Sequence, residues 1–205
     1  MGPGALAVSA PELVTMTPWR DDANLGRAYN DAMGRLAADE WAIFLDHDAM
    51  PTTGLWHKQF AEAATFLPDA GAIVAMTNRI ASPWQRCGDR ESNDIAVHRR
   101  IGAERAGIRS LLDISETKGF GGVMFAISKA AWAAAGGFAD GLGCVDHSIH
   151  FRLRAIGRTV WMHEGIYVYH WRHFGEPDPT SRFPKAAGCQ CRGPETAPTR
   201  RIALP

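Results

Sequence analysis

The stretch that decides the fold is Trp41-Ala-Ile-Phe-Leu45, followed directly by Asp46-His47-Asp48. A short apolar run between polar residues is typical of a strand buried on both faces, as in a parallel sheet, although a buried helical turn has the same pattern. In open α/β sheets, ligands bind beyond the carboxyl ends of the strands. We therefore expect the carboxylates of Asp46 and Asp48 at the rim of a sheet. There they would suit Mg²⁺ or Mn²⁺, which could hold a diphosphate, although an Asp-x-Asp is also common in solvated turns and helix caps.

The composition is that of an ordinary globular chain. Its 205 residues are 46% hydrophobic and 21% charged, enough for one well-buried domain and short for two. Lys plus Arg and Asp plus Glu both number 22, so net charge favours neither nucleic acid nor a membrane surface as a partner. The sequence has no apolar stretch of bilayer-spanning length and no basic start of a signal peptide. The four cysteines are too few and too uneven for a disulfide framework, so we expect reduced thiols in a cytoplasmic protein.

Hydrophobic periodicity predicts alternating strands and helices. We expect strands at residues 13–17, 41–45, 71–77, 110–114, 123–127, 158–162 and 166–169, and helices at 24–36, 55–67, 94–109, 128–135 and 146–157. Residues 1–12 are expected to be a mobile lead-in, 13–175 a single domain, and 176–205 a tail or flap rich in Pro, Gly and Arg. The polar segment 79–94 fits a disordered surface loop and a substrate-ordered flap equally well.

The order of several short motifs resembles family 2 of the inverting GT-A glycosyltransferases, over residues 14–173. The motifs are Asn24-Leu-Gly26, Asp46-His-Asp48, Gly121-Gly122, Gly136-Gly-Phe138, Asp146, and Arg152-Leu153 followed by Gly157. The resemblance implies a Rossmann-like three-layer α/β/α sandwich with a mostly parallel central sheet. It also implies the metal-dependent transfer of a sugar, with inversion, from a UDP or GDP sugar to the hydroxyl of a glycan or other acceptor.

The resemblance also implies roles for individual residues. Asp48 would be a direct ligand of Mn²⁺ or Mg²⁺, Asp46 would touch the ribose or the metal, and His170 would complete the metal site. Asp146 would be the general base that deprotonates the acceptor. Further positions would contact the nucleotide (Pro18, Trp19, Asp22, Asn24, Gly26, Asp46 and His47) or the sugars and acceptor (Gly121, Gly122, Val145 and His147).

The chain departs from the family pattern at two places. The acid that usually precedes the base is Val145, and the acid that often follows it is Ser148. One strand rather than two precedes the helix that begins near Asn24, so base recognition would fall to the loop 18–22, with Trp19 stacking and Asp21 or Asp22 bonding. Otherwise the chain would be a minimal member that binds its donor poorly.

Other functions remain open at this point. A non-catalytic nucleotide-sugar or glycan-binding module with a degenerate fold would explain Val145 and the missing strand. A nucleotidyltransferase is less favoured, because no Gly-rich phosphate loop lies near the first strand. A transition-metal site is a further, weaker hypothesis; it would use Asp146 with four histidines, His147, His150, His170 and His173.

Overall fold

The computed structural model describes residues 10–171 and 196–205. Its elements, in chain order, are β1 (Leu13–Met16), α1 (Leu25–Met33), β2 (Trp41–Leu45), β3 (Ala49–Pro51), α2 (Trp56–Phe66), β4 (Ala70–Thr77), α3 (Ile95–Arg105), β5 (Ser110–Asp113), β6 (Met124–Ser128), α4 (Lys129–Ala134), α5 (Val145–Ala155), β7 (Thr159–His170) and β8 (Arg200–Ala203). Side chains of Asn24, Asp94 and Ser128 cap α1, α3 and α4 by accepting a hydrogen bond from a backbone N–H of the first turn. These residues are where the sequence predicts the three helices to begin.

The strands form a mixed sheet in the order β1-β2-β6-β4-β7-β5-β8, and β3 pairs with β7 off this path. β1 is parallel to β2 and β4 is parallel to β7, whereas β6 is antiparallel to both of its neighbours, β2 and β4. Along the path from β1 to β7, β6 alone therefore runs against the common direction. This arrangement confirms the predicted α/β class, with antiparallel pairs added at the edge by β5 and β8.

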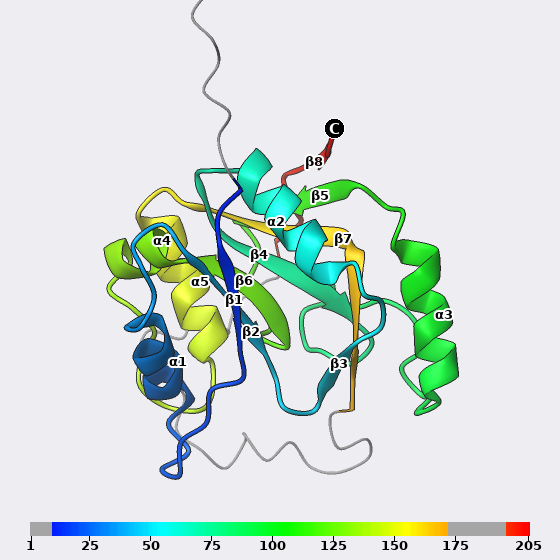
Figure 1. Ribbon diagram of the computed structural model, residues 1–205, viewed down its shortest axis with the longest axis horizontal. Helices are drawn as coiled ribbons and strands as arrows, with labels where there is room; N and C mark the ends of the chain where they lie inside the picture. Colours follow the sequence, from blue (N-terminus) through cyan, green and yellow to red (C-terminus); the bar gives the residue numbers. More distant parts are fainter. Residues whose placement is uncertain (1–9, 172–195) are drawn as a thin grey trace, which may run out of the picture.

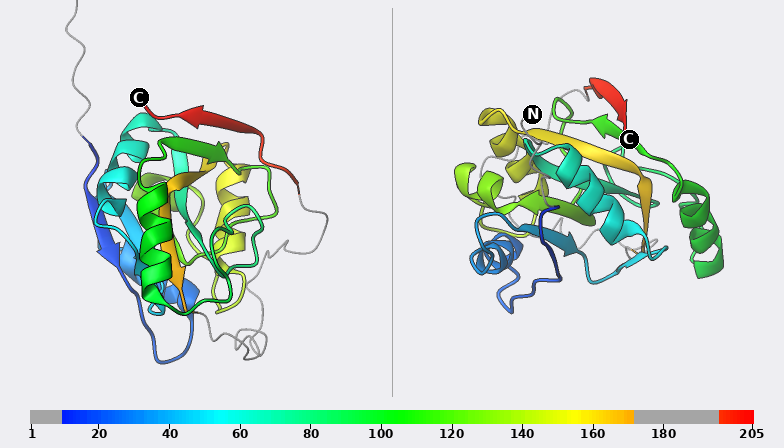
Figure 2. Two further views of the ribbon diagram at one scale, coloured as in Figure 1. Left: turned by 90° about the vertical axis from the view of Figure 1, so that its right-hand side faces the viewer. Right: turned by 45° about the horizontal axis from the view of Figure 1, so that its top comes forward.

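β2 is buried on both faces, as its apolar sequence predicts. Trp41 and Ile43 pack in the cluster that includes the buried side chains of α2, whereas Ala42 and Phe44 pack in the cluster with α1, α4 and α5. The two groups of helices lie on opposite faces of the sheet (Figures 1 and 2). Such alternation between two apolar faces is the geometry of a strand inside a three-layer structure.

Three elements differ from the sequence prediction. The two strands expected at 158–162 and 166–169 are one strand, β7, whose pairing with β4 shifts register between His163 and Tyr167. The three-residue strand β3 was not predicted, because it is too short to show periodicity. Residues 200–203, inside the stretch expected to be a tail or flap, form β8 along β5 at the sheet edge (Figure 2).

Among the described residues, no helix is long and apolar enough to cross a membrane.

The start of α1 is locked against the loop that leads to α5. The Gly26 N–H donates to the Gly141 carbonyl at 3.0 Å, and the Asn24 side chain accepts from the Gly141 N–H at 2.9 Å. A Cβ at Gly26 would lie 1.9 Å from the carbonyl oxygen of Ala139. Asn24 and Gly26 therefore have structural roles, because they fix the approach to the helix that carries Asp146.

We predict that Gly26→Ala lowers the free energy of unfolding by about 2 kcal/mol or more, although alanine is the better helix former. The clash is with backbone, so no side-chain rotation can relieve it. Gly107→Ala is the matched control, because a Cβ there meets nothing within 4 Å. We expect its effect to stay within about 0.5 kcal/mol. Urea denaturation followed by tryptophan fluorescence measures both, and equal effects of the two substitutions would contradict the prediction.

Candidate metal centre and carboxylate site

Three of the side chains predicted to bind a metal converge at one end of the sheet. Asp46 follows β2, Asp48 precedes β3, and His170 ends β7; one possible ligand atom from each lies within 4.8 Å of the others. The antiparallel pairing of β3 with β7 places Ala49 opposite His170, and the Trp171 N–H donates to the Asp48 carbonyl at 2.9 Å. This pairing brings His170 Nε2 to 3.3 Å from Asp48 Oδ1.

The hydrogen bond of His170 Nδ1 shows how the ring is oriented toward Asp48. Nδ1 lies 2.7 Å from the carbonyl oxygen of Arg79. Because a carbonyl oxygen can only accept, Nδ1 carries the hydrogen, and in the neutral ring the lone pair is on Nε2. That lone pair then faces a carboxylate oxygen of Asp48, an arrangement that a proton or a cation between them would stabilise. A metal-binding histidine is commonly oriented by a carbonyl in this way.

The electrostatics of the two aspartates also fit a cation. Burial raises the pKa of Asp46 to about 7; the charge of His170 opposes this, and the charges of Asp48 and Asp146 add to it. Burial would also raise the pKa of Asp48, but its hydrogen bond to His170 and the charges of His170 and His47 lower it below the ordinary value. A bound cation would favour the ionised form of Asp46.

The donor set distinguishes between the two predicted ions. Carboxylate oxygens suit both Mg²⁺ and Mn²⁺, whereas an imidazole nitrogen is a softer ligand that Mg²⁺ rarely takes. With His170 as the third ligand beside Asp46 and Asp48, the site fits Mn²⁺ better than Mg²⁺.

Asp146 lies in the first turn of α5, and hydrogen bonds of Gly122 and Val123 connect it to the backbone of Asp46. Its Oδ2 accepts a hydrogen bond from the Gly122 N–H and its Oδ1 accepts one from the His147 N–H, both at 2.8 Å. The next residue, Val123, accepts from the backbone N–H of Asp46 at 2.9 Å. Burial raises the pKa of Tyr29, and the charges of Asp46 and Asp146 raise it further, so both carboxylates act on this one ring.

The residues expected to bind the nucleotide base lie in an exposed loop before α1. Trp19 is 77% exposed, and its indole N–H donates to Asp21 at 3.3 Å. Asp22 is held by Arg20 and by the backbone N–H of Asn24. Pro18 is half-buried and His47 is exposed beside the two metal-site aspartates. Trp19 is thus accessible for stacking on a base. The side chains of Asp22 and Asn24 instead accept backbone hydrogen bonds at the start of α1.

The structure corrects the role expected of Val145, and it groups His150 with no other possible metal ligands among the described residues. Val145 is 1% exposed and packs in the core, so its side chain is not available to an acceptor. The His147 ring packs on Gly119, where a Cβ would lie 2.4 Å from it. Burial lowers the pKa of His150 to about 4, and its Nε2 donates to the Ser115 carbonyl at 3.0 Å. The hypothesis of a histidine-rich transition-metal cluster is thus not supported among the described residues, and His173 lies outside them.

Arg79 and Gln85, two of the buried polar residues of the segment 79–94, were not predicted to take part in the site. Arg79 is 5% exposed and donates to the Trp171 carbonyl at 2.7 Å, and to backbone and side-chain oxygens of residues 90–93. Gln85 is fully buried and binds Gly121. The segment is therefore part of the framework of the site rather than a disordered loop. No periodicity marks either residue, so the sequence offers no signal for them.

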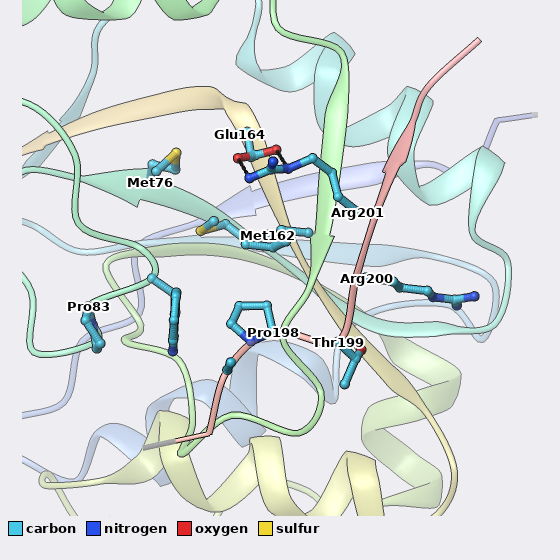
Figure 3. Close-up of a pocket in the computed structure, with 11 residues that line it drawn as sticks. Met76, Pro83, Met162, Glu164, Pro198, Thr199, Arg200 and Arg201 are labelled. Carbon is cyan, nitrogen blue, oxygen red and sulfur yellow. Dashed lines mark hydrogen bonds and ion pairs between the residues drawn. The ribbon is translucent and has the colours of Figure 1, made fainter. Parts of the chain in front are cut away.

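A separate cavity of about 490 Å³ lies near β8 (Figure 3). Met76, Met162 and Pro198 form apolar walls, and Glu164 pairs with Arg201 at 2.8 Å on another side. None of the residues that the sequence predicts for the site lines it.

We predict that Asp46 makes stability fall as pH rises. An unfolded aspartate has a pKa near 3.9 and folded Asp46 has one of about 7, so between these values the folded state binds more protons than the unfolded state. The free energy of unfolding should therefore drop, by up to about 4 kcal/mol between pH 4 and pH 8, relative to Asp46→Asn. At pH 8 without metal the variant should be the more stable protein, and Mn²⁺ should stabilise the wild type alone.

Urea denaturation at several pH values, with EDTA and with Mn²⁺, measures this difference. The exposed Asp39→Asn is the control and should follow the wild type. Parallel pH profiles of wild type and Asp46→Asn would show that the buried carboxyl group has no such effect.

Comparison of the chain with models of known protein families and with curated protein sequences gives no match.

Proposed function

We propose that the protein is a metal-dependent, inverting glycosyltransferase that moves a sugar from a UDP or GDP sugar to an acceptor hydroxyl. The observation that carries this proposal is the convergence of Asp46, Asp48 and His170 at the end of β2. The adjacent backbone of Gly122 and Val123 links Asp146 to this group. The α/β class supports the proposal at the level of the fold, and assignment to the GT-A group is part of the proposal. With free thiols at Cys87 and Cys144, a cytoplasmic location belongs to it as well.

The donor side of the reaction needs a positive charge next to the leaving diphosphate. Asp46, Asp48 and His170 Nε2 would hold a Mn²⁺ ion, which neutralises the charge that develops on the leaving phosphate. The side chains of His47 and Trp19 are exposed, so a nucleotide could contact both.

The acceptor side needs a proton acceptor of fixed orientation. Each oxygen of Asp146 receives one backbone N–H, and each keeps a further lone pair for the proton of an acceptor hydroxyl. As the oxygen of the acceptor hydroxyl forms its bond to the anomeric carbon, the bond from that carbon to the diphosphate breaks and the hydroxyl proton passes to Asp146. One direct displacement inverts the anomeric configuration.

A non-catalytic nucleotide-sugar or glycan-binding module is the second candidate. The core position of Val145, where the family has an acid, and the single strand before α1 favour it. A module of this kind would bind a nucleotide sugar or a glycan without turnover, so two experiments separate the candidates.

The first experiment is calorimetric titration with UDP and with GDP, each with Mn²⁺ and with EDTA. We predict that one nucleotide binds only with Mn²⁺, and that Asp48→Ala weakens this binding at least about 100-fold because a charged ligand is lost. Asp39→Asn should bind as the wild type does. Binding of neither nucleotide to folded wild type would contradict the metal-diphosphate site and the glycosyltransferase, and would favour a degenerate module that binds glycans.

The second experiment measures release of the nucleotide from donor sugars offered with a panel of glycan acceptors. We predict that Asp146→Asn lowers kcat by about 100- to 10,000-fold, the contribution typical of a general base. Its affinity for the nucleotide with Mn²⁺ should stay within twofold of the wild type, because the metal ligands are untouched. Nucleotide binding without any turnover by the wild type would favour the binding module.

A further inference from the structure

The side chain of Gln85 pairs with the backbone of Gly121 at both of its polar groups. Gln85 Oε1 accepts from the Gly121 N–H at 2.6 Å, and Nε2 donates to the Gly121 carbonyl at 3.1 Å. The second hydrogen of Nε2 is used by the carbonyl of Ala75 in β4, at 3.2 Å. Gln85 is 0% exposed, so these bonds are protected from water and its amide has a single orientation.

The Gly121 carbonyl and the Gly122 N–H belong to the same peptide group. Because a peptide group is planar and trans, fixing the direction of the carbonyl also fixes the direction of the N–H on its other side. That N–H donates to Asp146 Oδ2 at 2.8 Å. Gln85 therefore acts on Asp146 through one rigid plane, donating at one end of the peptide while the other end donates to the carboxylate.

This peptide has unusual freedom to rotate, because a glycine lies on each side of it. Glycine populates positive and negative φ with similar ease, so a flip of the Gly121-Gly122 peptide has a small intrinsic cost. A Cβ at Gly121 would lie 2.1 Å from Cδ1 and 2.5 Å from Cγ1 of Ile80, so a larger residue there would have to displace this side chain. Glycine fits the available space, and a separate group is needed to hold the peptide.

We propose that Gln85 is a positioning residue that keeps the Gly122 N–H on Asp146, and that it sets the orientation of the carboxylate for proton transfer. This inference rests on the proposed function of Asp146 as the base. The hydrogen bonds of the Gln85 side chain go to Ala75 and Gly121 and to none of the three proposed metal ligands, so we expect its loss to affect the base and to leave Asp46, Asp48 and His170 in place.

The test compares Gln85→Met with Gln59→Met. Gln59 is the matched control, because it is also buried and its Nε2 also donates to two carbonyls, those of Ala106 and Gly165, under α2. We expect Gln85→Met to lower kcat about 10- to 100-fold, as misplacement of a catalytic group does, with the donor KM and the Mn²⁺ affinity within twofold of wild type. Gln59→Met should lower Tm and leave kcat within twofold. An unchanged kcat in Gln85→Met, or an equal loss in both variants, would overturn the proposal.

Amide hydrogen exchange followed by NMR gives a readout that does not need activity. Gln85 does not bond the Gly122 N–H, so a merely local loss would expose the Gly121 amide alone. We expect Gln85→Met to lose protection at Gly122 as well, and Gln59→Met to keep both. Gln85→Leu removes the same hydrogen bonds with an apolar side chain and adds no charge, so it should show the same loss at Gly122 if the methionine variant does not fold. Retained protection at Gly122 in a folded variant would overturn the proposal.

The two failures are distinguishable. If the wild type turns over no donor, the proposed glycosyltransferase function fails, and exchange at Gly122 still decides whether Gln85 positions Asp146. If the wild type is active and neither kcat nor exchange responds to Gln85, the positioning role alone is wrong.

Discussion

The partial burial of the Asp46 carboxyl group at the end of β2 is the constraint to which the rest of the site responds. Burial raises the pKa of Asp46 to about 7; the charge of His170 opposes this rise, and the charges of Asp48 and Asp146 add to it. The pairing of β3 with β7 places His170 beside Asp48. Holding Asp46 in its charged form has an energetic cost, which a cation bound there would offset.

The segment between β4 and α3 serves both halves of the site. At its start, the Arg79 carbonyl orients His170 while the Arg79 guanidinium holds Trp171 and residues 90–93. A few residues later, Gln85 holds the peptide that contacts Asp146. Buried polar groups of this kind stabilise one arrangement strongly because every alternative leaves a donor or acceptor unpaired. A single irregular segment can therefore keep the proposed metal centre and the proposed base in fixed relation.

The elements that were predicted from sequence are those with clear periodicity. The apolar run from Trp41 to Phe44 and the polar residues Asn24 and Ser128 at the predicted helix starts are local signals; the structure confirms a strand buried on both faces and helices that begin there. The sequence predicts two strands where the structure has β7, because His163-Glu164-Gly165 interrupts the apolar pattern. The pairing with β4 shifts register at the same place. β3 and β8 are stabilised by pairing with distant strands, which no local pattern reports.

The sequence by itself determined that an apolar strand ends in two carboxylates, since side-chain polarity and strand alternation are properties of neighbouring residues. It also placed Asp146 in the first turn of a helix. Only the tertiary structure decided that His170 faces Asp48 while His150 stays in the core, and that Arg79 and Gln85 organise the site. These choices depend on strand register and on hydrogen bonds between segments far apart in the chain, and register is set by the packing of the whole sheet rather than by any single segment.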